Sequence, residues 1–109
     1  MKHLSKQERL LLLNQETGIV KWSDLQIHFA RGVLIHVNHN LDLVTVADTF
    51  VVDHKDTINA WKKKKWVQLT PPDLAIHWEK DQITLWAIVV APWVLVQEQQ
   101  TSDLPPVKT

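Results

Sequence analysis

Cysteine is absent from the 109-residue chain, and glycine occurs only twice, as Gly18 and Gly32. The lack of cysteine excludes disulfides, iron–sulfur clusters and zinc sites built on thiolates, and it fits a reducing compartment. Two isolated glycines cannot form the glycine-rich loops that hold phosphates in nucleotide- and dinucleotide-binding enzymes. These enzyme classes are therefore excluded, and we expect a cytoplasmic protein.

Neither sign of charge is in excess, because twelve lysine and arginine residues balance twelve aspartate and glutamate residues. No global field therefore attracts nucleic acid or anionic lipid, and any such affinity must be local. The most apolar run is shorter than the roughly 20 residues that span a bilayer, so we expect no membrane segment. Residues 1–13 mix charged residues with leucines, so we also expect no secretory leader.

The most apolar run extends from Ile83 to Gln97. It is rich in β-branched and aromatic residues, which favours a strand, and Pro92 argues against a helix. Both of its alternating faces are apolar, so both must be covered. We therefore predict one long central strand, bent near Ala91-Pro92, with residues 33–37 as its neighbour.

Helix signals are frequent in the rest of the chain. Ser5 and Glu8 have the spacing of a capping box, and Gly32 is well placed to end a helix as a left-handed cap. The pattern predicts helices over about 5–20, 23–30, 41–52, 54–64 and 70–82. The expected N-caps are Ser5, Ser23, Asn40, Asp53 and Thr70. Short strands are expected over 33–37 and 66–69.

These elements predict an α+β fold, with a small three-stranded sheet covered by about five helices. The helix pair over 41–64 has the form of a helix-turn-helix, and the flanking strands match a winged-helix arrangement with an extra helix in its wing. Length and composition predict a single globular domain over residues 1–98. Residues 99–109 are polar and contain prolines, so we expect a mobile C-terminal tail.

In a winged-helix protein, the helix over 54–64 would be the recognition helix. Its candidate nucleic-acid contacts are Lys55, Lys62, Lys63, Lys64 and Lys65. However, cations at a helix end also favour the helix dipole without any ligand, and Asp53 and Asp56 would repel phosphate. Nucleic-acid binding is therefore the alternative function and not the leading one.

No group of residues has a sequence context that predicts catalysis. His36, His39 and Asp42 have metal-ligand chemistry, but a spacing of three residues between a strand and a turn does not make the imidazoles converge. We therefore predict no metal, no cofactor and no catalytic residue. A ligand surface is indicated only if four charged residues meet in one pocket. These candidates are Glu16, Arg31, Asp42 and Asp53.

Tryptophan is abundant, with six residues in the chain. Trp22, Trp61 and Trp78 lie on the apolar sides of predicted helices, so we expect them in the core. Trp86 and Trp93 lie seven positions apart on the long strand, which places them on opposite faces of a regular strand, or on one face if the proline region contains a bulge. Both are candidate self-association residues.

The most specific motif of the chain is LWAIVVAPWVLVQ, at residues 85–97. Further motifs are ETGIVKW at 16–22, FARG at 29–32 and LDLVTVA at 41–47, followed by Asp53, Trp61 and Trp78. With these motifs the chain resembles a family of small bacterial proteins classified as a domain of unknown function. The resemblance covers residues 10 to 98 and implies no activity, ligand or catalytic residue. The chain departs from the family pattern at Gly18, where alanine is usual, and in the four lysines after Trp61, which weakens the nucleic-acid interpretation.

A long strand that is apolar on both faces requires more cover than 109 residues easily provide. The leading functional hypothesis is therefore a small cytoplasmic interaction module that self-associates, most simply as a homodimer. The alternative is a winged-helix nucleic-acid-binding protein, and a small-molecule enzyme is the least favoured class. Neither a membrane nor a cofactor is expected as a partner.

Overall fold

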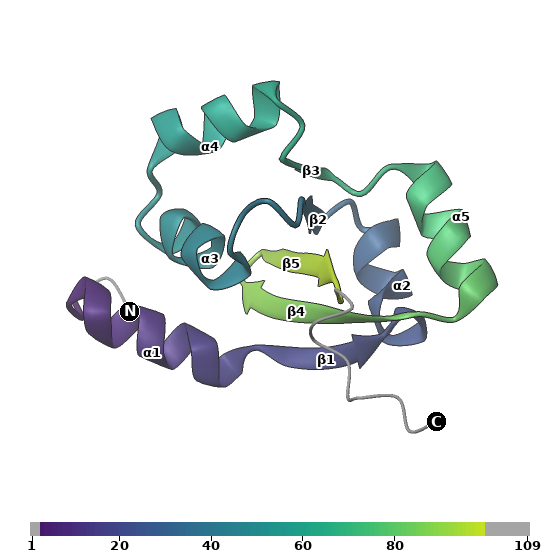
Figure 1. Cartoon of the computed structure of the whole chain (residues 1–109), viewed down its shortest axis with the longest axis horizontal. Helices are drawn as coiled ribbons and strands as arrows, with labels where there is room; N and C mark the ends of the chain where they lie inside the picture. The colour runs from purple at the N-terminus through teal and green to yellow at the C-terminus, as the bar shows by residue number, and fades with distance from the viewer. Residues whose placement is uncertain (1–2, 100–109) are drawn as a thin grey trace, which may run out of the picture.

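A mixed sheet of five strands forms the centre of the fold (Figure 1). The structure is a computed structural model that describes residues 3–99. The strands lie in the order β1-β4-β5-β2-β3, and β5 pairs with β2 in parallel, whereas the other pairs are antiparallel. Their bounds are β1 (Gly18–Lys21), β2 (Leu34–Val37), β3 (Val67–Leu69), β4 (Thr84–Val90) and β5 (Trp93–Glu98).

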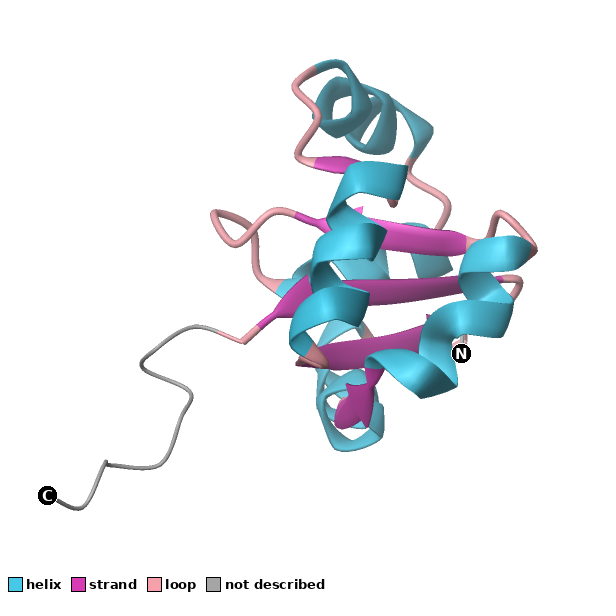
Figure 2. Cartoon of the chain, turned by 90° about the vertical axis from the view of Figure 1, so that its right-hand side faces the viewer, coloured by secondary structure: helices cyan, strands magenta, loops and turns pink. Residues whose placement is uncertain are grey.

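Five helices surround the sheet in the described part of the chain. They are α1 (Lys6–Glu16), α2 (Trp22–Ala30), α3 (Leu43–Val51), α4 (Lys55–Lys63) and α5 (Pro72–Asp81). Buried residues of α1 and α3 pack on one face of the sheet and those of α2 and α5 on the other, so helices lie both in front of the strands and behind them in Figure 2. The α4 helix lies beside the edge strand β3. The predicted α+β class is confirmed, and no helix over residues 3–99 has the length and apolarity to cross a membrane.

The long apolar run is a hairpin, so the prediction of one bent strand was wrong. The β4 and β5 strands pair from Leu85↔Glu98 to Val90↔Trp93, and the connecting Ala91-Pro92 peptide is cis. Both faces of both strands are largely apolar, which leaves Ala91-Pro92 as the turn signal between them. The central position of the run is nevertheless confirmed, and so is its pairing with residues 34–36.

Side chains of the hairpin alternate between two hydrophobic clusters. On one face, Ile88 and Leu95 pack with Leu13 of α1 and with α3. On the other face, Leu85 and Val96 pack with α2 and α5. Helices of the same chain thus cover most of both faces of the hairpin, and Val89 on the side of α2 and α5 is 64% exposed. The homodimer stays a prediction.

The prediction of three strands was also wrong, because β1 was missed. The first helix was expected to continue to about residue 20, but it ends at Glu16 and the chain then pairs with β4. Thr17 helps to end the helix, since its Oγ1 donates a hydrogen bond to the carbonyl oxygen of Leu13 (2.8 Å). The resulting five-stranded mixed sheet shows no winged-helix topology.

The predicted capping box at the start of α1 is confirmed. Ser5 Oγ accepts a hydrogen bond from the N–H of Glu8 (3.2 Å), and Glu8 Oε1 accepts one from the N–H of Ser5 (3.1 Å). The second predicted box, at Ser23, was wrong, because α2 begins at Trp22 without a side-chain cap. The β1 strand leads directly into α2, so the connection is too short for a separate capping turn.

Three further caps differ from the prediction. Asp42 caps α3 in place of Asn40, and His54 caps α4 in place of Asp53. Thr70 does not cap α5, because its hydroxyl donates a hydrogen bond to the carbonyl oxygen of Leu34 (3.0 Å). Several neighbouring polar residues can cap the same helix, and the boundary of a helix can move by one or two residues. Which residue becomes the cap therefore depends on contacts with the rest of the fold.

Four helices end with a residue in the left-handed conformation. After α2 this residue is Gly32 (φ 72°), as predicted, and the N–H of Val33 donates to the carbonyl oxygen of His28 (3.1 Å). After α3, α4 and α5 the position is occupied by Asp53 (φ 56°), Lys65 (φ 60°) and Gln82 (φ 51°). A non-glycine residue costs about 1 kcal/mol in this conformation, so these three turns are mildly strained.

A partly buried ion pair joins the two helices on one face of the sheet. Arg9 of α1 and Asp48 of α3 are linked by a contact of 2.6 Å between Nε and Oδ1. A second nitrogen of Arg9 donates to the carbonyl oxygen of Leu4 (2.7 Å). The hydrogen bond that Arg9 donates to the Asp48 carboxylate raises the pKa of Arg9. This pair fixes α1 against α3 at the start of the chain.

The two glycines provide a matched pair of positions, because Gly32 has the left-handed conformation and Gly18 does not. We expect Gly32→Ala to lower the free energy of unfolding by about 1–2 kcal/mol, because the left-handed conformation is unfavourable for alanine. A Cβ at Gly18 meets no atom within 4 Å, so Gly18→Ala should be neutral or stabilising by up to about 1 kcal/mol. Urea unfolding measures both changes, and equal effects at the two positions would contradict the assignment.

Candidate functional site

A groove lies where α3, α4 and the sheet meet, and we call it the α4 groove. It consists of two adjoining hollows, of about 470 Å³ and about 320 Å³. The first is lined by Ile35, Phe50, Lys62, Val67, Gln68, Leu69 and Trp93. The second is lined by Phe50, Asp53, Lys55, Ile58, Asn59, Lys62 and Trp93. Phe50, Lys62 and Trp93 border both hollows and therefore define the centre of the groove.

Two turns bring these residues together. The hairpin turn ends at Trp93, which places this side chain on the same sheet face as α3. The left-handed residue Asp53 ends α3 and redirects the chain into α4. Phe50 in the last turn of α3 and Lys62 in the last turn of α4 consequently lie on the same groove.

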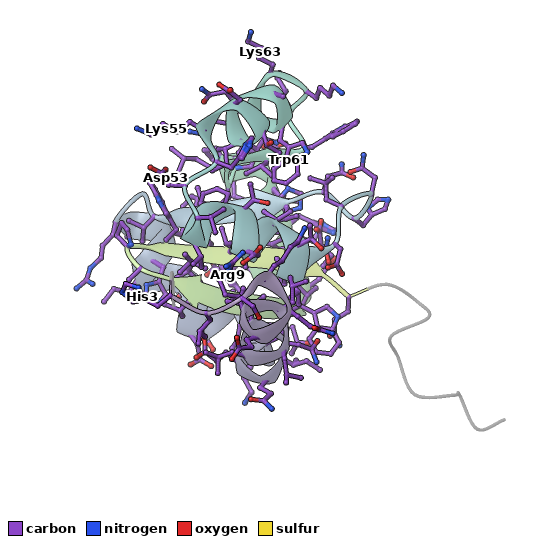
Figure 3. The ribbon with its side chains drawn as sticks, turned by 90° about the vertical axis from the view of Figure 1, so that its left-hand side faces the viewer. His3, Arg9, Asp53, Lys55, Trp61 and Lys63 are labelled. Carbon is purple, nitrogen blue, oxygen red and sulfur yellow. The ribbon has the colours of Figure 1, made fainter. Side chains whose placement is uncertain are left out.

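The charged residues around α4 differ in their contacts. Figure 3 shows Asp53, Lys55, Trp61 and Lys63 gathered around this helix, at the other end of the molecule from α1. Lys55 Nζ lies 3.9 Å from Asp53 Oδ2, and both side chains are exposed. Lys62 makes no ion pair within residues 3–99. It is therefore the lysine of the groove that is free to meet an anion.

The four lysines after Trp61 lie at one end of α4 but serve different local roles. Lys62 lines the groove, and Lys63 is exposed. Lys64 places its Nζ 4.4 Å from the ring centre of Trp66, and Lys65 is the left-handed residue that ends the helix. Their role as nucleic-acid contacts, together with that of Lys55, stays a prediction.

Trp86 and Trp93 lie on the same face of the sheet, although they belong to different strands. Both pack against the hydrophobic cluster beneath α1 and α3. Trp93 borders the α4 groove, whereas Trp86 lines a separate hollow of about 300 Å³ together with Asp42 and Gln97. Of the two predicted arrangements, the one with both tryptophans on the same face is therefore observed, but its cause is the hairpin and not a bulge in a single strand.

The four charged candidates do not meet in one pocket. Asp42 and Asp53 lie at opposite ends of α3, in different hollows. Asp42 Oδ2 accepts hydrogen bonds from the N–H (3.0 Å) and the hydroxyl (2.8 Å) of Thr45, which is the role of a helix cap. Glu16 and Arg31 are exposed at the ends of α1 and α2. A shared ligand surface therefore has no geometric support, and any functional role of these residues stays a prediction.

A partly buried pair between His36 and Glu98 was not predicted. His36 Nε2 lies 2.6 Å from Glu98 Oε1, and the His36 ring lies 5.7 Å from the ring of Trp78. Burial raises the pKa of Glu98, but the hydrogen bond and charge of His36 outweigh burial, so the pKa lies below its ordinary value. His36 is thus engaged with Glu98, and residues 3–99 contain no group of three potential ligands that could hold a metal.

The fold and its grooves define a small α+β protein with an apolar, lysine-bordered surface groove. The chain belongs to the family described as "Protein of unknown function (DUF2288)", whose model matches residues 10–98. The predicted family resemblance is therefore confirmed. A solved structure, the NMR solution structure of PA1075 from Pseudomonas aeruginosa, is similar at 34% identity and a TM-score of 0.75, with 97% of each chain covered. No curated protein matches the chain significantly.

The His36–Glu98 pair predicts an acid-sensitive contribution to stability. Because the folded-state pKa of Glu98 is lowered, the contribution is complete above the ordinary glutamate pKa of about 4.3 and disappears as the pH falls through the lower folded value. We expect Glu98→Gln to lower stability near neutral pH and to reduce the loss of stability on acidification. Urea unfolding between about pH 7 and about pH 3 measures this. The exposed Glu79→Gln variant is the control, and identical pH profiles for both variants would refute the coupling.

Proposed function

We propose that this protein is a cytoplasmic, non-catalytic interaction module that self-associates through the edge strand β1. The observation that carries the proposal is the exposure of Ile19, which is 52% exposed on a strand that pairs with β4 alone among the strands of residues 3–99. An apolar side chain on an open sheet edge favours pairing with another strand. Ile19 also lies opposite Trp86, one of the two predicted self-association residues.

The backbone of β1 is suited to pairing with a second copy. The N–H of Trp22 donates to the carbonyl oxygen of Ile83 (3.2 Å). In an antiparallel pair, the backbone N–H and C=O groups of every second residue point to the neighbouring strand, so those of Gly18 and Val20 point to β4. The backbone groups of Ile19 and Lys21 consequently point to the outer edge. Two β1 strands related by a two-fold axis would pair in antiparallel fashion, with Ile19 of each copy opposite Lys21 of the other. Each of these two residue pairs exchanges two backbone hydrogen bonds, so the dimer gains four and the two sheets become one.

The other edge of the sheet is less suited to self-association. The β3 strand has three residues, follows a run of lysines and is followed by Pro71 and Pro72. Short length, lysine and proline are the features by which edge strands avoid pairing. Two copies meeting there would also bring their lysine runs together, whereas β1 contributes one lysine, Lys21.

A second candidate function is nucleic-acid binding by α4, favoured by the gathering of Lys62, Lys63, Lys64 and Lys65 at one helix end. Phosphate contacts weaken as salt increases, so binding should be strongest at low ionic strength. An electrophoretic shift of duplex DNA at low salt that is lost in Lys63→Glu would favour this function. This candidate was first derived from a predicted winged-helix architecture. The sheet shows no such topology, so the lysines are the support that remains.

Association through β1 is tested by placing a charge on the edge. We expect Ile19→Lys to weaken the dimer by about tenfold or more, because an edge lysine opposes strand pairing. Leu69→Lys is the matched control, since Leu69 is 55% exposed on the opposite edge strand and should leave the dimer unchanged. Sedimentation velocity measures both. A wild-type protein that stays monomeric at micromolar concentration, or equal effects of the two variants, would overturn the proposal.

A further inference from the structure

We propose that the α4 groove binds a small organic anion with an apolar body, such as a medium-chain carboxylate. The apolar body would lie between Phe50 and Trp93, and its charged head would meet Lys62. The groove lies at the β3 side of the sheet, away from β1. Binding there is therefore independent of self-association.

The floor and walls of the groove suit an apolar body. Ile35 and Val67 at its base are 4% and 0% exposed. Phe50 and Trp93 are half-buried lining residues, and Leu69 remains 55% exposed. Covering these aromatic and aliphatic surfaces removes apolar area from water, which contributes about 25 cal/mol for each Å² buried. The hollow of about 470 Å³ falls in the range of small-molecule sites.

The charges around the groove favour an anion. The segment from Asp53 to Lys65 carries five lysines and two aspartates. Of the two aspartates, Asp53 is the one that lines the groove, and it lies beside Lys55. Lys62 borders both hollows without an ion-pair partner in the described residues, so it can meet an incoming carboxylate directly. Asn59 in the second hollow adds an amide that can donate a hydrogen bond.

This combination discriminates among ligand classes. A nucleic-acid backbone would use the lysines but would leave the buried apolar base of the groove uncovered. A neutral apolar molecule would fill the base but would gain nothing from Lys62. An anion with an apolar body satisfies both features with a single molecule, as small-molecule sites commonly combine an apolar lining with few polar groups.

Three probes separate the contributions of charge and apolar body. Decanoate, below its micellar concentration, carries both features, acetate carries the charge alone, and decyltrimethylammonium carries the body with the opposite charge. In NMR titrations of the full chain, decanoate should shift the resonances of Phe50, Lys62, Leu69 and the Trp93 indole. Acetate and decyltrimethylammonium should produce much smaller shifts at these residues. Equal binding of the cationic probe, or decanoate shifts located elsewhere, would overturn the proposal.

A matched pair of lysine variants tests the role of Lys62. Lys62→Met keeps an unbranched apolar side chain but removes the charge, and we expect it to weaken decanoate binding by about tenfold, the loss of one charge-assisted contact. Lys63→Met is the control, because Lys63 is exposed and lines neither hollow. Thermal unfolding verifies that both variants remain folded. An equal loss in the two variants would show that general charge, and not this groove, attracts the anion.

Discussion

The antiparallel pairing of β4 with β5 is the interaction on which the rest of the structure depends. Each strand of this hairpin recruits one further strand, since β4 pairs with β1 and β5 pairs with β2. Alternating side chains of the hairpin then reach two separate hydrophobic clusters, so four helices are held to the sheet through it. Gln97 adds a link, because its Nε2 donates hydrogen bonds to the carbonyl oxygens of Asn38 (3.0 Å) and Leu41 (2.8 Å).

Local chemistry made part of this fold predictable. The capping box at Ser5 and the left-handed cap at Gly32 depend on residues a few positions apart, and both were predicted correctly. The hairpin turn was missed because the apolar residues on either side of Ala91-Pro92 continue the same pattern. The β1 strand was missed because its four residues pair with β4, more than sixty positions later in the chain. Pairing over such a distance leaves no periodic signal.

In the candidate site, too, single residues were predictable from the sequence, whereas contacts between distant residues were not. Asp53, Lys55, Lys62 and Trp93 were each selected from the sequence, but for unrelated reasons, and only the fold reveals that they border one groove. The His36–Glu98 pair depends on the parallel alignment of β2 with β5, which brings together residues 62 positions apart. Sequence patterns therefore indicated individual side chains of the site, but which of them lie together depends on the order of the strands in the sheet.

A strained left-handed residue lies at each end of α4, which lowers the free energy needed to open this helix locally. Neither Asp53 nor Lys65 is glycine, and Ile58 is the one buried residue that α4 contributes. Local opening costs little where few apolar contacts are broken and backbone strain is released. We therefore expect α4 to open locally at a lower free-energy cost than the hairpin. Such opening would move one wall of the α4 groove and change its width, while the sheet stays unchanged.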